Sequence, residues 1–207
     1  MAIVETQEQI ENIAKEIGKE YKYKTVKVKT SAYMDFKVRW TRSYQWIDFI
    51  VSDYLIGLSE EAISGMFDTL FSKIMGGDRS DYGEEFVSEV FSQAYLDRHR
   101  PTYIKRNRIK DAPYQEFDDV QVYFKSFSND KAVGYSAFFR TIFLNDVLKD
   151  APKDILETLI ADTYNTLQDA KQQIMMDRLV ITDSAPLPKE DIEKAENYLT
   201  DIGLEWC

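Results

Sequence analysis

The stretch from residue 133 to residue 170 constrains the fold of this chain more than any other part. It begins with an apolar, aromatic run from Val133 to Leu144, whose length, β-branched content and polar flanks predict a buried strand. A helix over 152–174 follows, with Asp150 as the expected N-cap and a proline in the first turn, where its missing N–H is not needed. Because apolar side chains recur along this helix at helical spacing, one of its sides must face a core.

Helix and strand signals alternate along the rest of the chain. Lysine alternates with apolar residues over 21–29, which predicts a strand with one solvated face. Ser59 followed by two acids predicts the start of a helix, and Gly76 and Gly77 predict its end. An apolar run over 178–182 is left unassigned, and 183–188 reads as a stiff linker. Strands are expected at 21–29, 33–40, 46–55, 120–127 and 133–144, the last two as a hairpin, and helices at 5–20, 59–76, 84–96, 152–174 and 189–201.

These signals together predict an α+β fold. A chain of 207 residues with 44% hydrophobic residues can bury one sizeable core, so a single domain over 1–207 is expected. Residues 1–30 are expected to add a helix and a basic strand as an N-terminal extension. Residues 31–202 are expected to form the core, a mainly antiparallel sheet of about four or five strands packed with helices. No internal repeat is recognisable in the sequence.

Three segments carry a family pattern. Val133-Gly134-Tyr135-Ser136, followed by Arg140 and Ile142, leads into the long helix, and weaker matches lie in 41–55 and 100–108. Together they resemble an archaeal group of zincin-like proteins related to the SprT-type metallopeptidases, in which such a strand precedes a helix carrying H-E-x-x-H. The resemblance extends over about residues 33–200 and implies a zincin-like core.

The helix departs from that family at the metal motif. The H-E-x-x-H window falls on Asp162-Thr163-Tyr164-Asn165-Thr166, so aspartate and threonine replace the two histidines and Thr163 replaces the glutamate. A zincin needs two imidazoles on the metal and a carboxylate that takes a proton from the metal-bound water. The resemblance therefore implies an inactive metallopeptidase homologue with no catalytic residue, and a vestigial site at Asp162, Thr163, Thr166 and Arg140.

The supply of metal ligands supports this interpretation. The chain has one histidine, His99, and one cysteine, Cys207. Catalytic zinc sites take three protein ligands, drawn mainly from histidine, cysteine and carboxylates. A site rich in histidine or cysteine cannot form within one copy of the chain, so no metal and no other cofactor are predicted. Cys207, at the last position, is expected to lie in a disordered end.

A second possibility is an enzyme that binds a divalent cation through oxygen ligands. Asp162, Thr166 and Asp169 share one helix face at i, i+4 and i+7, and such ligands suit a hard cation such as Mg²⁺ or Mn²⁺. The simpler expectation is that Asp169 faces solvent and Asp162 hydrogen-bonds within the former pocket. Arg140, within an apolar run, needs a paired acid, for which Asp162 or Asp53 is the expected partner. That ion pair would stand where the charge of the metal once stood.

Charge distribution leaves a third possibility. The net charge of −10 argues against broad binding to nucleic acid, yet 19–30 and 98–110 are locally basic. A basic strand beside the aromatic segment 33–40 suits nucleic-acid binding, whereas lysines on an edge strand that discourage edge pairing are the simpler explanation. His99 is expected to be an exposed loop residue. A contact with an anion or a partner is assigned to Arg98, His99, Arg100, Lys105, Arg106 and Arg108.

Composition points to a folded cytoplasmic protein without a membrane anchor. No apolar run approaches the ~20 residues that a membrane helix needs, and the N-terminus lacks the layout of a signal peptide. A single cysteine suits a reducing compartment. The leading functional prediction is a non-catalytic, zincin-like protein that binds an unknown macromolecule or serves as a scaffold. The oligomeric state is not predicted.

Overall fold

The computed structural model describes residues 2–77, 83–175 and 187–206 and confirms an α+β fold. The chain forms two compact units, an N-terminal unit with described residues 2–77, 83–103 and 173–175, and a C-terminal unit with 104–172 and 187–206. The apolar run over 178–182, most of the linker over 183–188 and Cys207 lie outside the described residues. No helix in the described part of the chain is long and apolar enough to cross a membrane.

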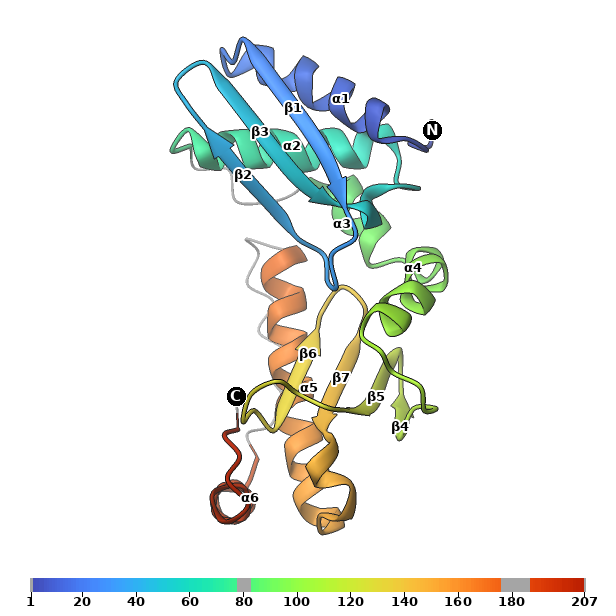
Figure 1. Ribbon diagram of the computed structural model, residues 1–207, viewed down its shortest axis with the longest axis vertical. Coiled ribbons are helices and arrows are strands. Elements are labelled where there is room, and N and C mark those ends of the chain that lie inside the picture. The colour runs from blue at the N-terminus through green and yellow to red at the C-terminus, as the bar shows by residue number, and fades with distance from the viewer. Residues whose placement is uncertain (1, 78–82, 176–186, 207) are drawn as a thin grey trace. The chain divides into compact units, whose positions relative to one another are not determined.

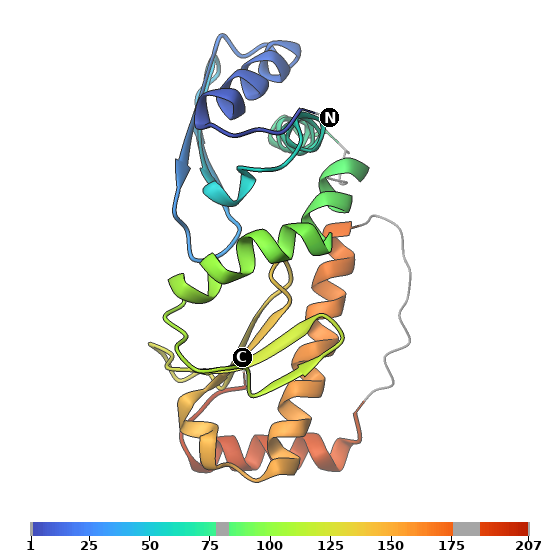
Figure 2. The same cartoon turned by 90° about the vertical axis from the view of Figure 1, so that its right-hand side faces the viewer.

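The N-terminal unit is a three-stranded sheet with two helices on one face (Figures 1 and 2). Strand order is β1-β3-β2, with β1 parallel and β2 antiparallel to the central strand β3. Inward and outward side chains alternate along β1 and β3, as expected for strands with one covered face. The elements are α1 (Gln7–Glu20), β1 (Thr25–Ser31), β2 (Val38–Arg42), β3 (Trp46–Ser52), a 3₁₀ helix (Asp53–Leu55) and α2 (Glu60–Ile74).

Local sequence signals define the two helices of this unit. Thr6 and Gln9 form a capping box at the start of α1. Ser59 accepts a hydrogen bond from the Ala62 N–H at the start of α2, as predicted. Gly18 lies in the last turn of α1, where an added Cβ would come 2.5 Å from Val26 Cγ2. Only glycine therefore lets α1 approach β1 this closely.

The edge strand β1 is protected by side chains from α1. The Val28 N–H donates to Glu11 Oε2 at 3.1 Å, and the Thr30 N–H donates to Gln7 Oε1 at 2.8 Å. An open strand edge is a template for pairing with another chain, and these two bonds occupy donors on that edge. The helix thus protects the edge of β1 by hydrogen bonding as well as by covering one face.

Replacing Glu11 with alanine is expected to lower the free energy of unfolding by about 1 kcal/mol at neutral pH, because the Val28 N–H loses its acceptor. The pKa of Glu11 is lowered, first by its hydrogen bond with Lys15 and then by the Val28 N–H. A lowered carboxyl pKa stabilises the fold above its ordinary value of 4.5, and this stabilisation is lost as the pH falls through the folded pKa. Urea denaturation of wild type and variant at pH 7 and pH 3 should therefore show the difference shrinking in acid. Glu11→Gln, which keeps an acceptor, serves as the control, and equal stability of Glu11→Ala and wild type at pH 7 would contradict this account.

The basic segment that follows is helical. The expected helix over 84–96 is divided into α3 (Glu84–Val90) and the start of α4 (Gln93–Arg106). Helix α4 continues through Pro101, although proline removes the N–H that would bond to the carbonyl four residues earlier. Most of the basic segment 98–110 therefore belongs to a helix.

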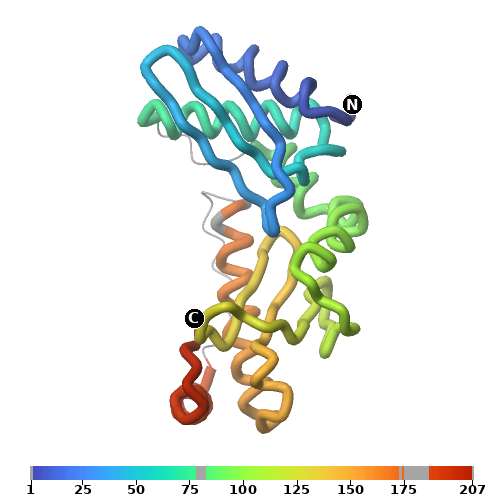
Figure 3. The backbone as a smooth tube through the Cα atoms, in the orientation of Figure 1, coloured from blue at the N-terminus to red at the C-terminus, as the bar shows by residue number. Residues whose placement is uncertain are grey.

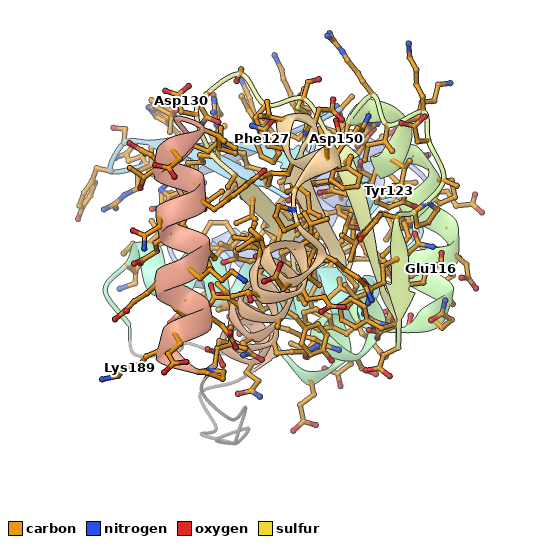
Figure 4. All side chains as sticks on the ribbon, turned by 90° about the horizontal axis from the view of Figure 1, so that it is seen from below. Glu116, Tyr123, Phe127, Asp130, Asp150 and Lys189 are labelled. Atoms are coloured by element: carbon orange, nitrogen blue, oxygen red, sulfur yellow. The ribbon has the colours of Figure 1, made fainter. Side chains whose placement is uncertain are left out.

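The C-terminal unit is a four-stranded sheet with the long helix α5 along one face (Figure 1). Strand order is β4-β5-β7-β6, with β5 parallel to β7 and the other two ladders antiparallel. Apolar side chains of β5 and β7 form a core with α5, and Ala195 and Leu199 of α6 join it. Figure 4 shows Lys189 at the start of α6, and near the other end of this helix it shows Asp130, which lies between β5 and β6. The elements are β4 (Gln115–Phe117), β5 (Val120–Lys125), β6 (Val133–Ser136), β7 (Thr141–Asn145), a 3₁₀ helix (Asp146–Asp150), α5 (Lys153–Met175) and α6 (Lys189–Asp201).

The run over 133–144 is a hairpin and not one strand. Strands β6 and β7 pair with each other across the turn 137–140, and β5 pairs with β7 in parallel. The predicted hairpin of 120–127 with 133–144 was therefore wrong. The turn closes at Arg140, which adopts a left-handed conformation with φ +45°, and the Arg140 carbonyl accepts from the Gln121 N–H at 3.0 Å. The turn contains no glycine, proline or asparagine, so the sequence gives no signal from which a turn would be predicted here.

The two units repeat one topology, which the sequence analysis did not detect (Figure 3). In each, a first strand pairs in parallel with a third, the second strand is antiparallel to the third, and a 3₁₀ helix leads into a long helix. The turns match in sequence as well, since Ser52-Asp53-Tyr54-Leu55 corresponds to Asn145-Asp146-Val147-Leu148. Ser52 has φ −63° and ψ 139°, and Asn145 has φ −62° and ψ 137°. Leu55 and Leu148 are both fully buried.

Candidate functional site

Helix α5 carries the predicted vestigial site. Asp162 is half-buried, Thr163 is buried and Thr166 is exposed. The Thr163 hydroxyl donates to the Leu159 carbonyl at 2.7 Å, and the Thr166 hydroxyl donates to the Asp162 carbonyl at 3.1 Å. Both hydroxyls thus bond to carbonyls of their own helix. Asp169 is exposed, as predicted.

The part of the chain that the structure describes contains no cluster of side chains that could hold a metal ion. Within 2–77, 83–175 and 187–206, no three or more side chains of histidine, cysteine, aspartate or glutamate come together as a metal site requires. The face of α5 that carries Asp162, Thr166 and Asp169 is therefore not joined there by further carboxylates in a ligand-like group.

Arg140 is buried and pairs with Asp119. Arg140 is 4% exposed, and its Nη1 donates to Asp119 Oδ2. Lys171 Nζ lies 4.0 Å from the same carboxylate oxygen. Asp119 belongs to the segment 111–119, which reads as an exposed acidic loop but forms β4 and the turn into β5. Arg140 therefore has a paired acid, as expected, but the pair with Asp119 was not among those predicted.

The electrostatics around Asp119 are set by burial and by the neighbouring charges. Burial lowers the pKa of Lys171, Arg140 lowers it further, and Asp119 opposes both effects. About two turns before Lys171 in α5, the Tyr164 hydroxyl donates to Asp118 Oδ2 at 3.3 Å, and the Tyr164 ring lies 5.0 Å from that of Phe117. Burial, followed by the charge of Asp118, raises the pKa of Tyr164. The cluster therefore ties α5 to the turn between β4 and β5.

The segment 98–108 does not present one basic surface. His99 is 9% exposed, and its ring lies 4.6 Å from that of Tyr95 and 5.6 Å from that of Tyr54. The expectation of an exposed loop histidine was wrong, because α4 directs Tyr95, His99 and Tyr103 inward at four-residue spacing. Arg98 donates to the Gly57 carbonyl. The remaining predicted contacts are mixed: Arg100 and Arg106 are half-buried, and Lys105 and Arg108 are exposed.

The other basic segment contributes to an open sheet face, which we call the β-face and define by Lys27, Lys29, Arg39, Trp46, Asp48 and Ile50. This face lies opposite α1 and α2 (Figure 2). Side chains that are paired across strands point to the same face, and the register pairs Lys29 with Ile50, Ile50 with Arg39, and Lys27 with Asp48. A groove of about 810 Å³ lies along these residues, and a smaller one, also lined by Lys27, Trp46 and Asp48, adjoins it.

Sequence reasoning named the β1 part of the β-face and the aromatic segment 33–40, which carries Arg39, but missed the contribution of β3. Segment 46–55 was expected to be mostly buried, because apolar residues occupy both phases of its alternation. In the structure, Ile47, Phe49 and Val51 face the helices, while Trp46 and Ile50 remain 39% and 40% exposed. A single charged residue in the outward phase, Asp48, was the available signal.

Comparison with known proteins adds no relative to this picture. No family model matches the chain, nor does any curated protein or any solved structure. The resemblance to SprT-related zincins stays a prediction.

Proposed function

We propose that this chain is a non-catalytic protein that binds another macromolecule through the β-face. One observation carries the proposal: a sheet face, left open by the residues that the structure describes, that combines exposed apolar side chains with three cations in a net acidic protein. The proposal includes the relationship to inactive zincin-like proteins, since the motif window holds Asp162, Thr163 and Thr166 and no imidazole.

The physical basis is the cost of leaving this face in water. Trp46 and Ile50 lie on the central strand, where a sheet face is usually covered by another layer. Covering them removes apolar area from water and releases about 25 cal/mol per Å². Lys27, Lys29 and Arg39 surround them and give the face the opposite sign to the net charge of −10. The partner is therefore expected to be anionic.

Binding of heparin, a sulfated polyanion, tests the proposal without assuming the natural partner. We expect wild-type protein to bind heparin at low salt, measured by isothermal titration calorimetry and by a change in tryptophan fluorescence. A triple variant with Lys27→Glu, Lys29→Glu and Arg39→Glu should bind at least tenfold more weakly.

A matched control makes the same change in charge elsewhere. Lys110, Lys153 and Lys189 are exposed residues of the C-terminal unit. Their replacement by glutamate should weaken heparin binding by no more than about twofold relative to the wild type, because it changes only the net charge. An equal loss in both triple variants would show only an effect of net charge and would overturn the proposal. Absence of binding by the wild-type protein would overturn it as well.

A further inference from the structure

We propose that the ligand of the β-face is single-stranded nucleic acid. This inference rests on the proposed function and names the class of partner. It is carried by the distribution of side chains over the three strands of the face, with cations on the outer strands and apolar side chains on the central strand.

Cations lie on the two outer strands and base-contacting groups lie on the central one. Strand β1 supplies Lys27 and Lys29, strand β2 supplies Arg39, and the central β3 supplies Trp46, Asp48 and Ile50. Neighbouring strands are about 4.8 Å apart, so the cations of β1 and β2 flank a strip about 10 Å wide. A strand of nucleic acid laid along β3 would place its bases on this strip and its phosphates beside the cations.

The central strand is long enough for more than one base. Trp46 and Ile50 are four residues apart on β3, which corresponds to about 13 Å. An indole that is 39% exposed offers a face on which an unpaired base can stack. Asp48, between the two apolar side chains, can accept hydrogen bonds from the N–H groups of a base.

Asp48 also favours nucleic acid over an acidic peptide as the ligand of the β-face. A carboxylate in the centre of the face would meet the carboxylates of an acidic peptide at close range, and like charges repel. A nucleic acid carries its charge at the phosphates and presents uncharged donors on its bases, which suits a face with cations at its margins. A duplex keeps its bases stacked inside, where Trp46 could not stack on them.

The Arg39 guanidinium is held in position by a neighbouring ring. It lies 5.8 Å from the centre of the Tyr33 ring, within the range of a cation–π contact. This contact reduces the freedom of the side chain, so that less entropy is lost when it meets a phosphate.

The number of cations sets the expected salt dependence. For single strands, the logarithm of the binding constant falls with the logarithm of the salt concentration by about 0.7 for each neutralised phosphate. Lys27, Lys29 and Arg39 together therefore predict a slope of about −2. Such a shallow slope indicates modest affinity, in agreement with a protein of net charge −10.

Fluorescence anisotropy with a labelled 12-nucleotide single strand, the matching duplex and a polyglutamate peptide tests the inference. The single strand is expected to bind at least tenfold more tightly than the other two, with the slope given above. Trp46→Ala should weaken binding about tenfold, and Trp46→Phe should restore most of it, because a phenyl ring also stacks on a base. Tyr135→Ala is the control, since Tyr135 lies on β6 and is 40% exposed, almost the same as Trp46.

The heparin experiment separates the two possible failures. If heparin binds at the β-face but the single strand binds no better than duplex or polyglutamate, the assignment of nucleic acid is overturned and the binding function stands. If neither heparin nor the single strand binds, both are overturned. Equal effects of Trp46→Ala and Tyr135→Ala would also overturn the stacking role of Trp46.

Discussion

Replacement of Asp119 with asparagine is expected to lower the free energy of unfolding by about 2–3 kcal/mol. Loss of one partner of a fully buried ion pair costs about 3–5 kcal/mol. The estimate for Asp119→Asn is lower because the Asp119 side chain is 33% exposed and solvent screens its charge. The variant removes the charge of the carboxylate that the buried Arg140 contacts, and the same carboxylate oxygen lies 4.0 Å from Lys171 Nζ in the wild type, so two charge interactions are weakened at once. Urea denaturation at pH 7 measures the difference.

Arg140→Met is the informative control for this prediction. It removes the buried charge together with its need for a partner, and the remaining Asp119 carboxylate keeps Lys171 and access to solvent. We therefore expect Arg140→Met to cost less than Asp119→Asn, and the double variant to cost less than the sum of the two. A larger loss in Arg140→Met than in Asp119→Asn would show that Arg140 acts through packing and not through its charge.

The regular elements with strong local signals were predictable from the sequence. Amphipathic spacing placed α1, α2, α5 and α6 close to their observed ends, and Ser59 is the N-cap of α2 as predicted. The predicted N-cap of α5 was wrong, because Asp150 ends the preceding 3₁₀ helix and α5 begins at Lys153. The alternation of lysine with apolar residues likewise placed β1. In these segments the local preference and the tertiary environment agree, so the pattern alone is sufficient.

Elements set by tertiary contacts were not predictable. The turn over 137–140 has apolar residues and an arginine in a left-handed conformation, which is held by the bond from the Gln121 N–H and by the pairing with Asp119. Pro101 marks a break in most sequences, yet α4 continues through it. Neither outcome follows from neighbours in the sequence, because the stabilising partners come from other segments.

The β-face shows the same limit for a functional surface. Lys27 and Lys29 were visible as an alternating pattern, but their neighbours Trp46 and Ile50 come from a strand some twenty residues later and are placed by the parallel pairing of β1 with β3. Strand register decides which of two apolar phases faces water, and a sequence with apolar residues in both phases does not encode that choice locally. The repeated topology was hidden for a related reason, since the two units share a turn motif but few identical residues.

Replacement of Phe71 with alanine is expected to cost the most of any single change proposed here, about 3–5 kcal/mol. Phe71 is fully buried in α2, and its ring lies 5.5 Å from Tyr21, 5.5 Å from Tyr23 and 5.4 Å from Phe49. Alanine favours the helix by only a few tenths of a kcal/mol over phenylalanine, so the loss of packing decides the sign. Urea denaturation measures the loss, and Tyr44→Ala, at a residue that is 93% exposed, should change stability by less than about 0.5 kcal/mol.

A graded variant keeps this prediction testable if Phe71→Ala does not fold. Phe71→Leu retains most of the volume and should cost about 1–1.5 kcal/mol. Since Phe49 of β3 packs its ring against Phe71 while Asp48 and Ile50 point the other way, a disturbed core should also loosen the strand that carries Trp46. Hydrogen exchange in β3 should therefore accelerate in Phe71→Leu and remain unchanged in Tyr44→Ala. A variant with normal exchange in β3 and a large loss of stability would show that the aromatic core holds the helices together without holding the β-face in place.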